Sequence, residues 1–268
     1  MDTYKCNYHM HSYYSDGALS PAQLVRKFVD EEYDIIALTD HDGIEGVKEF
    51  LACCEAVKIK GVTGIEFSTS HVFNGKDYEI HLLGYNFDPD NEQLVNTCKD
   101  LKVRRHERNI RLVQKLNEMG YDLDLDELES QSKGKYVGKP NVARVMVSKG
   151  YIEKPIEAFS NTILESPEVK AIRKRKLSTE EAIRIVTEAG GQAFVAHPAK
   201  IKEIDGRGTE AFWEEFEKIL KDLKLKGLKG LECIYPEHTE EEEIRFVQLA
   251  GKYHLHVSTG TDFHGDDI

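Results

Sequence analysis

Short apolar runs and longer amphipathic patterns alternate along most of this chain. The apolar runs are rich in Ile, Val, Leu and Tyr and have the length of buried β-strands. They predict seven strands, at residues 5–11, 34–39, 61–67, 79–85, 193–197, 228–234 and 254–259. Because strands that alternate with helical patterns form repeated strand–helix units, we expect an α/β fold with a parallel sheet or barrel.

Helix start and stop signals lie between several of these strands. The sequence Ser20-Pro21-Ala22-Gln23 combines a capping box with Pro at the first helical position, and it predicts a helix to about residue 32. A second helix is predicted from Ser178 to the Gly190-Gly191 pair. A third is predicted over 239–252, because acidic residues fill its first turn.

One long segment, residues 91–176, breaks this rhythm and shows only helical patterns and loops, with helices predicted at 94–119, 141–149 and 155–164. We interpret it as a helical insertion between two portions of a barrel. Two basic clusters lie within it, at 99–115 and at 170–176. For the first cluster we expect a solvated helix face, and for the second a position near an anionic substrate.

Composition and charge narrow the function. The 268 residues carry 36 Lys and Arg against 48 Asp and Glu, which gives a net charge of −12 and argues against electrostatic binding of long nucleic acid. No apolar run reaches the ~18–20 residues that cross a bilayer. The five cysteines form no Cys-x-x-Cys pair and the first residues lack a secretory pattern, so we expect a cytoplasmic protein with reduced thiols. Oligomeric state is not readable from the sequence.

Histidine and acidic residues cluster where the predicted strands end. His9 and His11 are two residues apart and point to the same side of a strand, and Asp40, His41 and Asp42 directly follow the second strand. Enzymes with an α/β barrel have their active sites at the carboxyl ends of the barrel strands. The candidate metal ligands at these ends are His9, His11, Asp16, His41, Glu66, His81, His197, Asp262 and His264.

Nine such residues are too many for one metal ion. Imidazole and carboxylate ligands without thiolate suit manganese, iron or zinc. Two or three divalent ions held close together would clamp a phosphoryl group and activate water. Four further histidines are not expected to bind metal: His71 in a predicted turn, His106 on the long helix, and His254 and His256 at the start of the last strand.

Four of these clusters resemble the motifs of the PHP (polymerase and histidinol phosphatase) family, and they read His9-Met10-His11, Thr39-Asp40-His41-Asp42, Ala196-His197-Pro198 and Asp262-Phe263-His264. Residues 8–21, with 138–140 and 235–239, are most similar to a bacterial group of 3′,5′-nucleoside bisphosphate phosphatases and 5′-to-3′ exoribonucleases. The resemblance implies a distorted seven-stranded α/β barrel formed by 1–90 and 177–268, with 91–176 as a helical domain that caps the active site.

The resemblance also implies how three ions would share the ligands. One ion would be held by His9, His11, Glu66 and Asp262. Glu66 would bridge to a second ion at His81 and His197, and a third would lie between Asp16, His41 and His264. Catalytic roles are implied for Glu66, Asp262 and His197. We expect Asp40, Asp42 and His238 to position ligands, because metal-bound histidines need a partner for their other ring nitrogen.

The substrate-binding positions depart from the family. This chain has Lys139 and Asn141 where the group often has Arg and His, and Lys200 where it often has Arg. Lysine cannot form the two-pronged contact that arginine makes with phosphate, so the substrate is less certain than the chemistry. Together with Arg175, these residues are the predicted substrate contacts.

The sequence thus predicts a metal-dependent phosphoesterase in which metal-bound hydroxide attacks phosphorus. Its expected substrate is a small phosphorylated nucleotide, either a 3′,5′-nucleoside bisphosphate or the 5′ end of a short RNA, and no membrane partner is expected. Two alternatives stay open. One is a metabolic phosphomonoesterase such as a histidinol-phosphate phosphatase, and the other is a non-catalytic metal-binding module.

Overall fold

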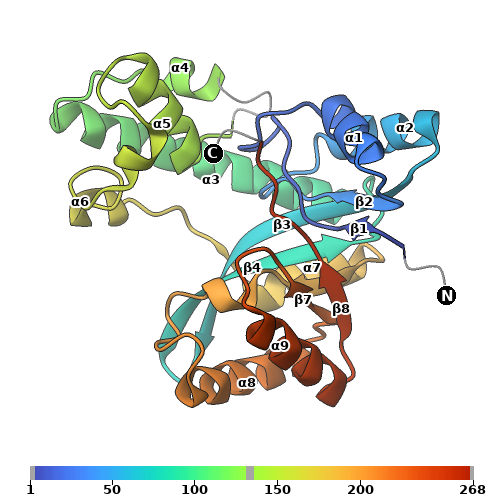
Figure 1. The fold of residues 1–268 in the computed structure, drawn as a ribbon. Helices are drawn as coiled ribbons and strands as arrows, with labels where there is room; N and C mark the ends of the chain where they lie inside the picture. Colours follow the sequence, from blue (N-terminus) through green and yellow to red (C-terminus); the bar gives the residue numbers. More distant parts are fainter. Residues whose placement is uncertain (1–3, 131–135, 266–268) are drawn as a thin grey trace.

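The strands of the protein form one mixed sheet that runs through the molecule (Figure 1). A computed structural model describes residues 4–130 and 136–265. The strands pair in the order β1-β2-β3-β4-β6-β7-β8, with β5 beside β3. Their bounds are β1 Cys6–Asn7, β2 Ile35–Leu38, β3 Lys60–Phe73, β4 Lys76–Tyr85, β5 Leu177–Ser178, β6 Gln192–Val195, β7 Gly230–Ile234 and β8 His256–Thr259.

The two ends of this strand path meet. The backbone N–H of Tyr8 donates to the carbonyl of Thr259 over 2.9 Å, and that of His11 donates to Phe263 over 2.8 Å. Met10 and Phe263 form an isolated parallel bridge. The first and last strands therefore lie side by side, an arrangement compatible with the expected seven-stranded barrel.

All seven expected strands are present, but the expected all-parallel order is wrong at β4. This strand runs antiparallel to both β3 and β6. It is joined to β3 by a tight turn at Asn74 and Gly75, both with positive φ, which suits an Asn-Gly hairpin. The hairpin extends β3 well past residue 67, so His71 lies buried in a strand rather than in the predicted turn.

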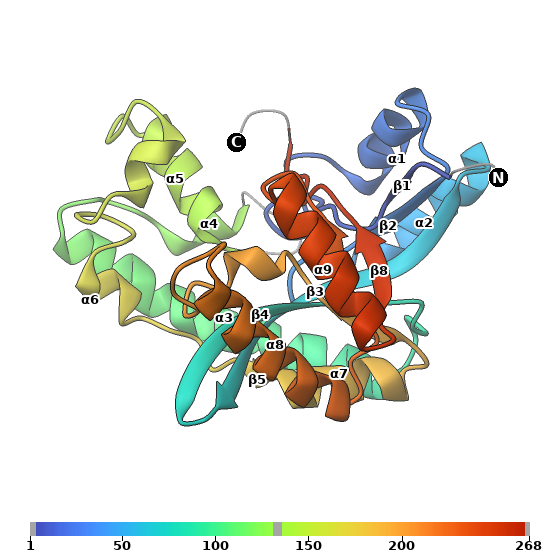
Figure 2. The same cartoon turned by 60° about the horizontal axis from the view of Figure 1, so that its bottom comes forward.

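Five helices accompany the sheet: α1 Pro21–Asp30, α2 Val47–Val57, α7 Thr179–Glu188, α8 Glu210–Leu225 and α9 Glu240–Lys252. The predicted capping box at Ser20 is present, with its side chain accepting from the backbone of Gln23. Figure 2 shows α9 in front of β8, and α8 packs beside α9 through Phe216 and Phe246, whose rings lie 5.3 Å apart. The sequence patterns did not single out α2 and α8.

The helical segment between β4 and β5 builds a core of its own. It contains α3 Glu92–Glu118, α4 Leu125–Ser130, α5 Lys139–Ser148, a 3₁₀ turn at Pro155–Phe159 in place of the predicted 155–164 helix, and α6 Pro167–Lys170. Residues of α3 such as Leu94 and Leu101 pack into the core around the sheet, whereas Leu112 and Leu116 pack with α4 and α5. The single helix α3 thus ties the two cores together (Figure 1).

No helix among the described residues is long and apolar enough to cross a membrane. The five cysteines are free thiols, three of them buried. Burial raises the pKa of the Cys54 and Cys233 thiols to about 12, so these two cysteines are packing residues rather than nucleophiles.

Candidate metal centre

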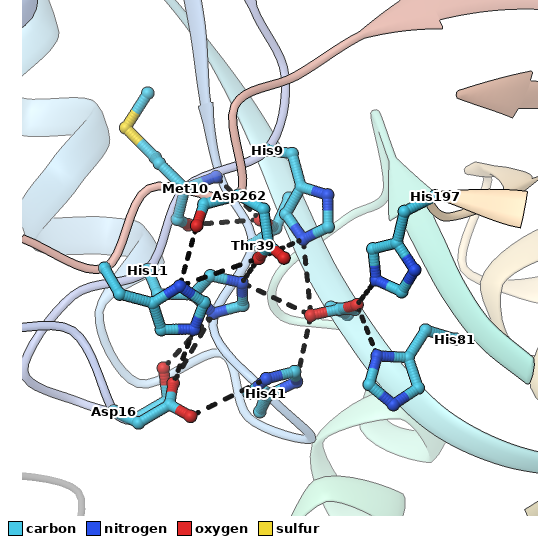
Figure 3. A network of polar contacts seen from close by, with 12 residues as sticks. His9, Met10, His11, Asp16, Thr39, His41, His81, His197 and Asp262 are labelled. Carbon is cyan, nitrogen blue, oxygen red and sulfur yellow. Dashed lines mark hydrogen bonds and ion pairs between the residues drawn. The ribbon is translucent and has the colours of Figure 1, made fainter. Parts of the chain in front are cut away.

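The nine predicted ligands, which span the chain from residue 9 to residue 264, come together in one buried cluster. Figure 3 shows the imidazoles of His9, His11, His41, His81 and His197 turned toward a common region. The residues reach it from the loop after β1, the loop after β2, the middle of β3 and of β4, and the loops after β6 and β8. The sequence analysis expected all nine ligands at strand ends. Glu66 and His81 instead lie inside the strands β3 and β4.

Glu66 lies at the middle of the cluster. Its side chain is fully buried in β3. Its two carboxylate oxygens divide five imidazoles between them: Oε2 is 3.3 Å from His9, 3.2 Å from His11 and 2.9 Å from His41, and Oε1 is 2.8 Å from His81 and 3.1 Å from His197. One carboxylate thus touches ligand groups on two sides, which is the geometry a bridging ligand needs.

Three groups of ligand atoms are close enough to hold a divalent ion each, every group lying within a 4.8 Å span. They are His9, His11, Glu66 and Asp262; His11, Asp16, His41 and His264; and His41, Glu66 and His81. The first group is the expected one. The second group contains the expected Asp16, His41 and His264, and adds His11. The third group contains His41 in place of the expected His197, although His197 also contacts Glu66.

The charges of the cluster are strongly coupled. Burial alone would raise the pKa of Glu66, but His41, His9 and His81 hold it well below its usual range. Burial likewise disfavours charge on His11, yet the neighbouring carboxylates of Asp262 and Glu66 raise its pKa to about 10. Burial disfavours charge on His81 too, and Glu66 raises its pKa to about 9. The buried carboxylates and imidazoles therefore need positive charge at this place, either from protons or from metal ions.

Several ligand atoms fit metal ions better than protons. Four ligand atoms are buried and make no hydrogen bond: His9 Nε2, Asp16 Oδ1, His41 Nδ1 and Glu66 Oε2. Groups of opposite charge nevertheless lie within 4 Å of each of them. Buried polar atoms without partners are rare and costly. Their chemistry, imidazole nitrogen and carboxylate oxygen without thiolate, is that of manganese, iron or zinc sites. The residues present thus fit two or three divalent cations.

The backbone around the cluster is strained. His197, Asp262 and Asp42 have φ values of 25°, 51° and 53°, a left-handed region that non-glycine residues rarely adopt. Such conformations persist only where the surrounding structure enforces them, and they gather at functional sites. Here they set the backbone direction at two predicted ligands, His197 and Asp262, and at Asp42, which directly follows the ligand His41.

Glu232 in β7 positions ligands, and the sequence patterns did not single it out. It is fully buried, and its carboxylate accepts from His9 Nδ1 over 3.0 Å and from the backbone N–H of His197 over 2.7 Å. An acceptor at the second ring nitrogen fixes the tautomer and orientation of a ligating histidine. The available signal was a lone glutamate inside the apolar run of β7.

The three residues expected to hold ligating histidines do not do so. Asp40 accepts from the backbone and hydroxyl of Ser12, each over 2.7 Å, and so fixes the loop that carries Asp16. Burial is the main reason why the pKa of Asp40 is raised. His238 bonds the carbonyl of Cys233 over 3.0 Å. Asp42 accepts from cations of the helical segment. Among the described residues, Glu232 fills the role expected of these three.

Of the four predicted substrate contacts, the structure places one beside the cluster. Lys200 Nζ is 2.8 Å from the hydroxyl of Tyr235, 2.9 Å from Glu237 and 3.9 Å from Asp262. The others are spread over the helical segment. Lys139 pairs with Glu165, Asn141 is buried and accepts from the backbone of Gly138 at the start of α5, and the side chain of Arg175 is exposed.

The basic face of α3 is only in part the solvated surface that the sequence suggested. Arg104, Arg108 and Arg111 donate to the backbone carbonyls of residues 175, 137 and 173. These bonds fasten the two segments that flank the helix, because a guanidinium carries several donors in a fixed fork. Arg105 is buried and donates to Asp42. The arginines of α3 therefore bind other parts of the protein, whereas Lys99 and Lys102 are exposed.

Comparison with known proteins agrees with this geometry. A family model described as the PHP domain matches residues 7–260. A 5′-3′ exoribonuclease of Haemophilus influenzae is 29% identical over 98% of this chain and 90% of its own. A phosphoribosyl 1,2-cyclic phosphate 1,2-diphosphodiesterase of Eggerthella lenta and a 3′,5′-nucleoside bisphosphate phosphatase of Chromobacterium violaceum are each 26% identical, over 96% of this chain and 93% and 86% of their own.

A solved structure supports the fold. An amidohydrolase of Chromobacterium violaceum, crystallised with bound sulfate, superposes with a TM-score of 0.85 and 25% identity, covering 98% of this chain and 89% of that one. The curated relatives share hydrolysis of phosphate esters, as their names state, and differ in the ester.

Proposed function

Because this chain belongs to the PHP domain family, we propose that it is a metal-dependent phosphoesterase acting on a small phosphorylated nucleotide, such as a 3′,5′-nucleoside bisphosphate or the 5′ end of a short RNA. The observation that carries the proposal is the gathering of eight histidine and acidic side chains around the buried carboxylate of Glu66. The names of the relatives support the substrate class.

The ligand set would hold two or three divalent ions. When bound, these ions would neutralise the phosphate oxygens and lower the pKa of the attacking water. Glu66 would keep neighbouring ions at a fixed separation, because its two oxygens face different imidazoles. Asp262 accepts a hydrogen bond from Tyr235 over 3.1 Å, which fixes one of its oxygens. With His197, these residues form the proposed catalytic group.

Lys200 would bind a phosphate oxygen of the substrate. Its present partner Glu237 is 59% exposed, and an exposed ion pair is worth only about 0–1 kcal/mol, so a phosphate group can displace it. Lys139, Asn141 and Arg175 remain predicted contacts for a more distant part of the substrate. We further propose that residues 91–176 cap the site, since Arg144 donates to the carbonyl of Asp16 over 2.9 Å and Tyr136 stacks on His41.

The net charge of −12 favours a small substrate over long nucleic acid. We place the enzyme in the cytoplasm, where its five free thiols would stay reduced.

A turnover screen with the manganese-loaded full chain tests the proposal, with inorganic phosphate measured for the monoesters and released mononucleotide for the RNA, because cleavage of a phosphodiester frees no inorganic phosphate. The panel is adenosine 3′,5′-bisphosphate, a short 5′-phosphorylated oligoribonucleotide and histidinol phosphate. Turnover of either nucleotide substrate with the highest kcat/KM supports the proposal. Preference for histidinol phosphate would favour the metabolic phosphomonoesterase, and no turnover of any substrate despite bound metal would favour the non-catalytic module.

A further inference from the structure

The helical segment brings an excess of buried positive charge to the edge of the metal centre. Arg105 Nη2 of α3 and Lys174 Nζ of the segment before β5 both donate to the same oxygen, Oδ2, of Asp42. The side chain of Arg105 is 7% exposed, that of Lys174 is 8% exposed and that of Asp42 is 2% exposed. Two cations thus share one buried carboxylate oxygen, in a chain that is acidic overall.

A third cation increases the imbalance. Arg108, one turn after Arg105 and half-buried, donates to the carbonyl of Val137 over 2.9 Å and has no carboxylate partner among the described residues. Burial lowers the pKa of Lys174 to about 8, and the charges of Arg105 and Arg108 add to the effect while Asp42 opposes it. Three cations against one carboxylate leave a net charge of +2.

This charge lies next to a metal ligand. The guanidinium of Arg105 sits 3.8 Å over the ring of Tyr136, and the same ring stacks on His41 with centroids 5.7 Å apart and planes 15° apart. Arg105, Asp42 and His41 line one cleft. An anion in this cleft would therefore meet Arg105 and the metal ligand His41 directly, whereas Lys174 reaches the cleft through its contact with Asp42.

A purely structural role does not account for all three cations. One of them would neutralise Asp42, and an uncompensated buried cation costs free energy. Another pair of cations that share one carboxylate differs in exposure. Lys139 and Lys170 both form ion pairs with Glu165, but their side chains are much more exposed than those of Arg105 and Lys174. Arg105 and Lys174 each use one donor on Asp42, so further N–H groups are available, and the guanidinium fork matches a phosphate group.

We propose that Arg105 and Lys174, supported by Arg108, bind the non-reacting phosphate of the substrate and so make the enzyme selective for substrates with two phosphate groups. The second phosphate would bring a charge close to −2, which balances the cluster. This inference rests on the proposed function, since it assumes that the other phosphate reacts at the metal centre. It assigns the second phosphate to residues other than Lys139, Asn141 and Arg175.

The test compares two substrates in the manganese-loaded full chain. Adenosine 3′,5′-bisphosphate carries the second phosphate, and p-nitrophenyl phosphate lacks it. Lys174→Gln should raise KM for the bisphosphate about 10-fold or more, the loss expected for a charge-assisted contact, and change KM for the aryl phosphate less than about 2-fold. Lys174→Arg should restore the bisphosphate KM, and the control Lys221→Gln, at an exposed lysine of α8, should leave both values unchanged.

A binding measurement separates this inference from the proposed function. Isothermal titration of adenosine 3′,5′-bisphosphate into the metal-free chain needs no turnover. Weaker binding by Lys174→Gln than by Lys221→Gln supports the phosphate site even if the wild-type chain proves inactive. Equal KM changes for both substrates, or equal binding by the two variants, would overturn the inference. Circular dichroism of each variant shows that the fold is retained.

Discussion

The barrel and the helical insertion contribute opposite chemistry to the same place. The barrel supplies imidazoles and carboxylates from positions 9 to 264, which only the closed strand path brings together. The insertion supplies Arg105, Arg108 and Lys174, which surround Asp42 at the edge of the ligand set. The barrel is thus suited to bind metal ions, and the insertion to bind the anion that the ions act on. The net charge of −12 conceals this division.

The largest expected effect is on the barrel side, at Glu66. Glu66→Gln removes the charge that faces five imidazoles, so we expect hydrolysis to fall by about 10³-fold or more, as for several kcal/mol of lost metal-centred stabilisation. Steady-state kinetics with p-nitrophenyl phosphate measures this. Glu217→Gln on the surface of α8 is the matched control and should keep full activity. Near-normal turnover by Glu66→Gln would remove the bridging role.

A smaller effect is expected at Glu232, which touches ligands only through hydrogen bonds. Glu232→Gln weakens the acceptor for His9 Nδ1 and for the His197 backbone, and losses at such positions lower metal affinity about 10–100-fold. Titration of the metal-free chain with Mn²⁺ measures the affinity directly. Unchanged affinity with unchanged folding would show that Glu232 serves only packing.

Two lysines distinguish the regions at the level of substrate binding. Lys200→Ala should raise KM for phosphate esters about 10-fold, because Nζ lies within 4 Å of Asp262. Lys139→Ala should have a smaller effect, confined to substrates that extend beyond the reacting phosphate, because Lys139 is held by Glu165 away from the ligands. A larger KM change from Lys139 than from Lys200 would mean that the insertion, rather than the barrel rim, anchors the reacting phosphate.

The last prediction concerns stability of the barrel without metal. Burial disfavours charge on His11 and His81, but neighbouring carboxylates raise their pKa to about 10 and about 9. A raised histidine pKa stabilises the fold below about pH 6.5 and loses this effect as pH rises through the folded value. The metal-free chain should therefore lose about 1 kcal/mol of stability per pH unit, or more, toward pH 9–10.

Metal should reverse that slope, because the ligands bind as neutral imidazoles and binding releases protons. Denaturant unfolding at several pH values, with a chelator or with Mn²⁺, gives both slopes. Parallel slopes in the two conditions would contradict the assignment of these histidines as ligands.

The sequence predicted the strands and singled out the side chains that converge in the cluster, because both depend on local patterns. A buried strand is a continuous apolar run, and polar residues such as His41 and His197 stand out where it ends. Direction of pairing is not local, and so β4 was wrongly expected to be parallel. The role of Glu232 and the contact of Asp42 with Arg105 and Lys174 could not be predicted for the same reason. The residues that interact there lie 35 to 223 positions apart in the chain.

The most direct test of the central claim is to count metal ions and measure turnover in the same sample. Purified full chain is stripped with a chelator, reloaded with Mn²⁺, desalted and examined by elemental analysis and by phosphate release. The account predicts two to three ions per chain, with activity that vanishes on stripping and returns on loading. Fewer than one ion per chain, with no hydrolysis after manganese addition, would contradict it.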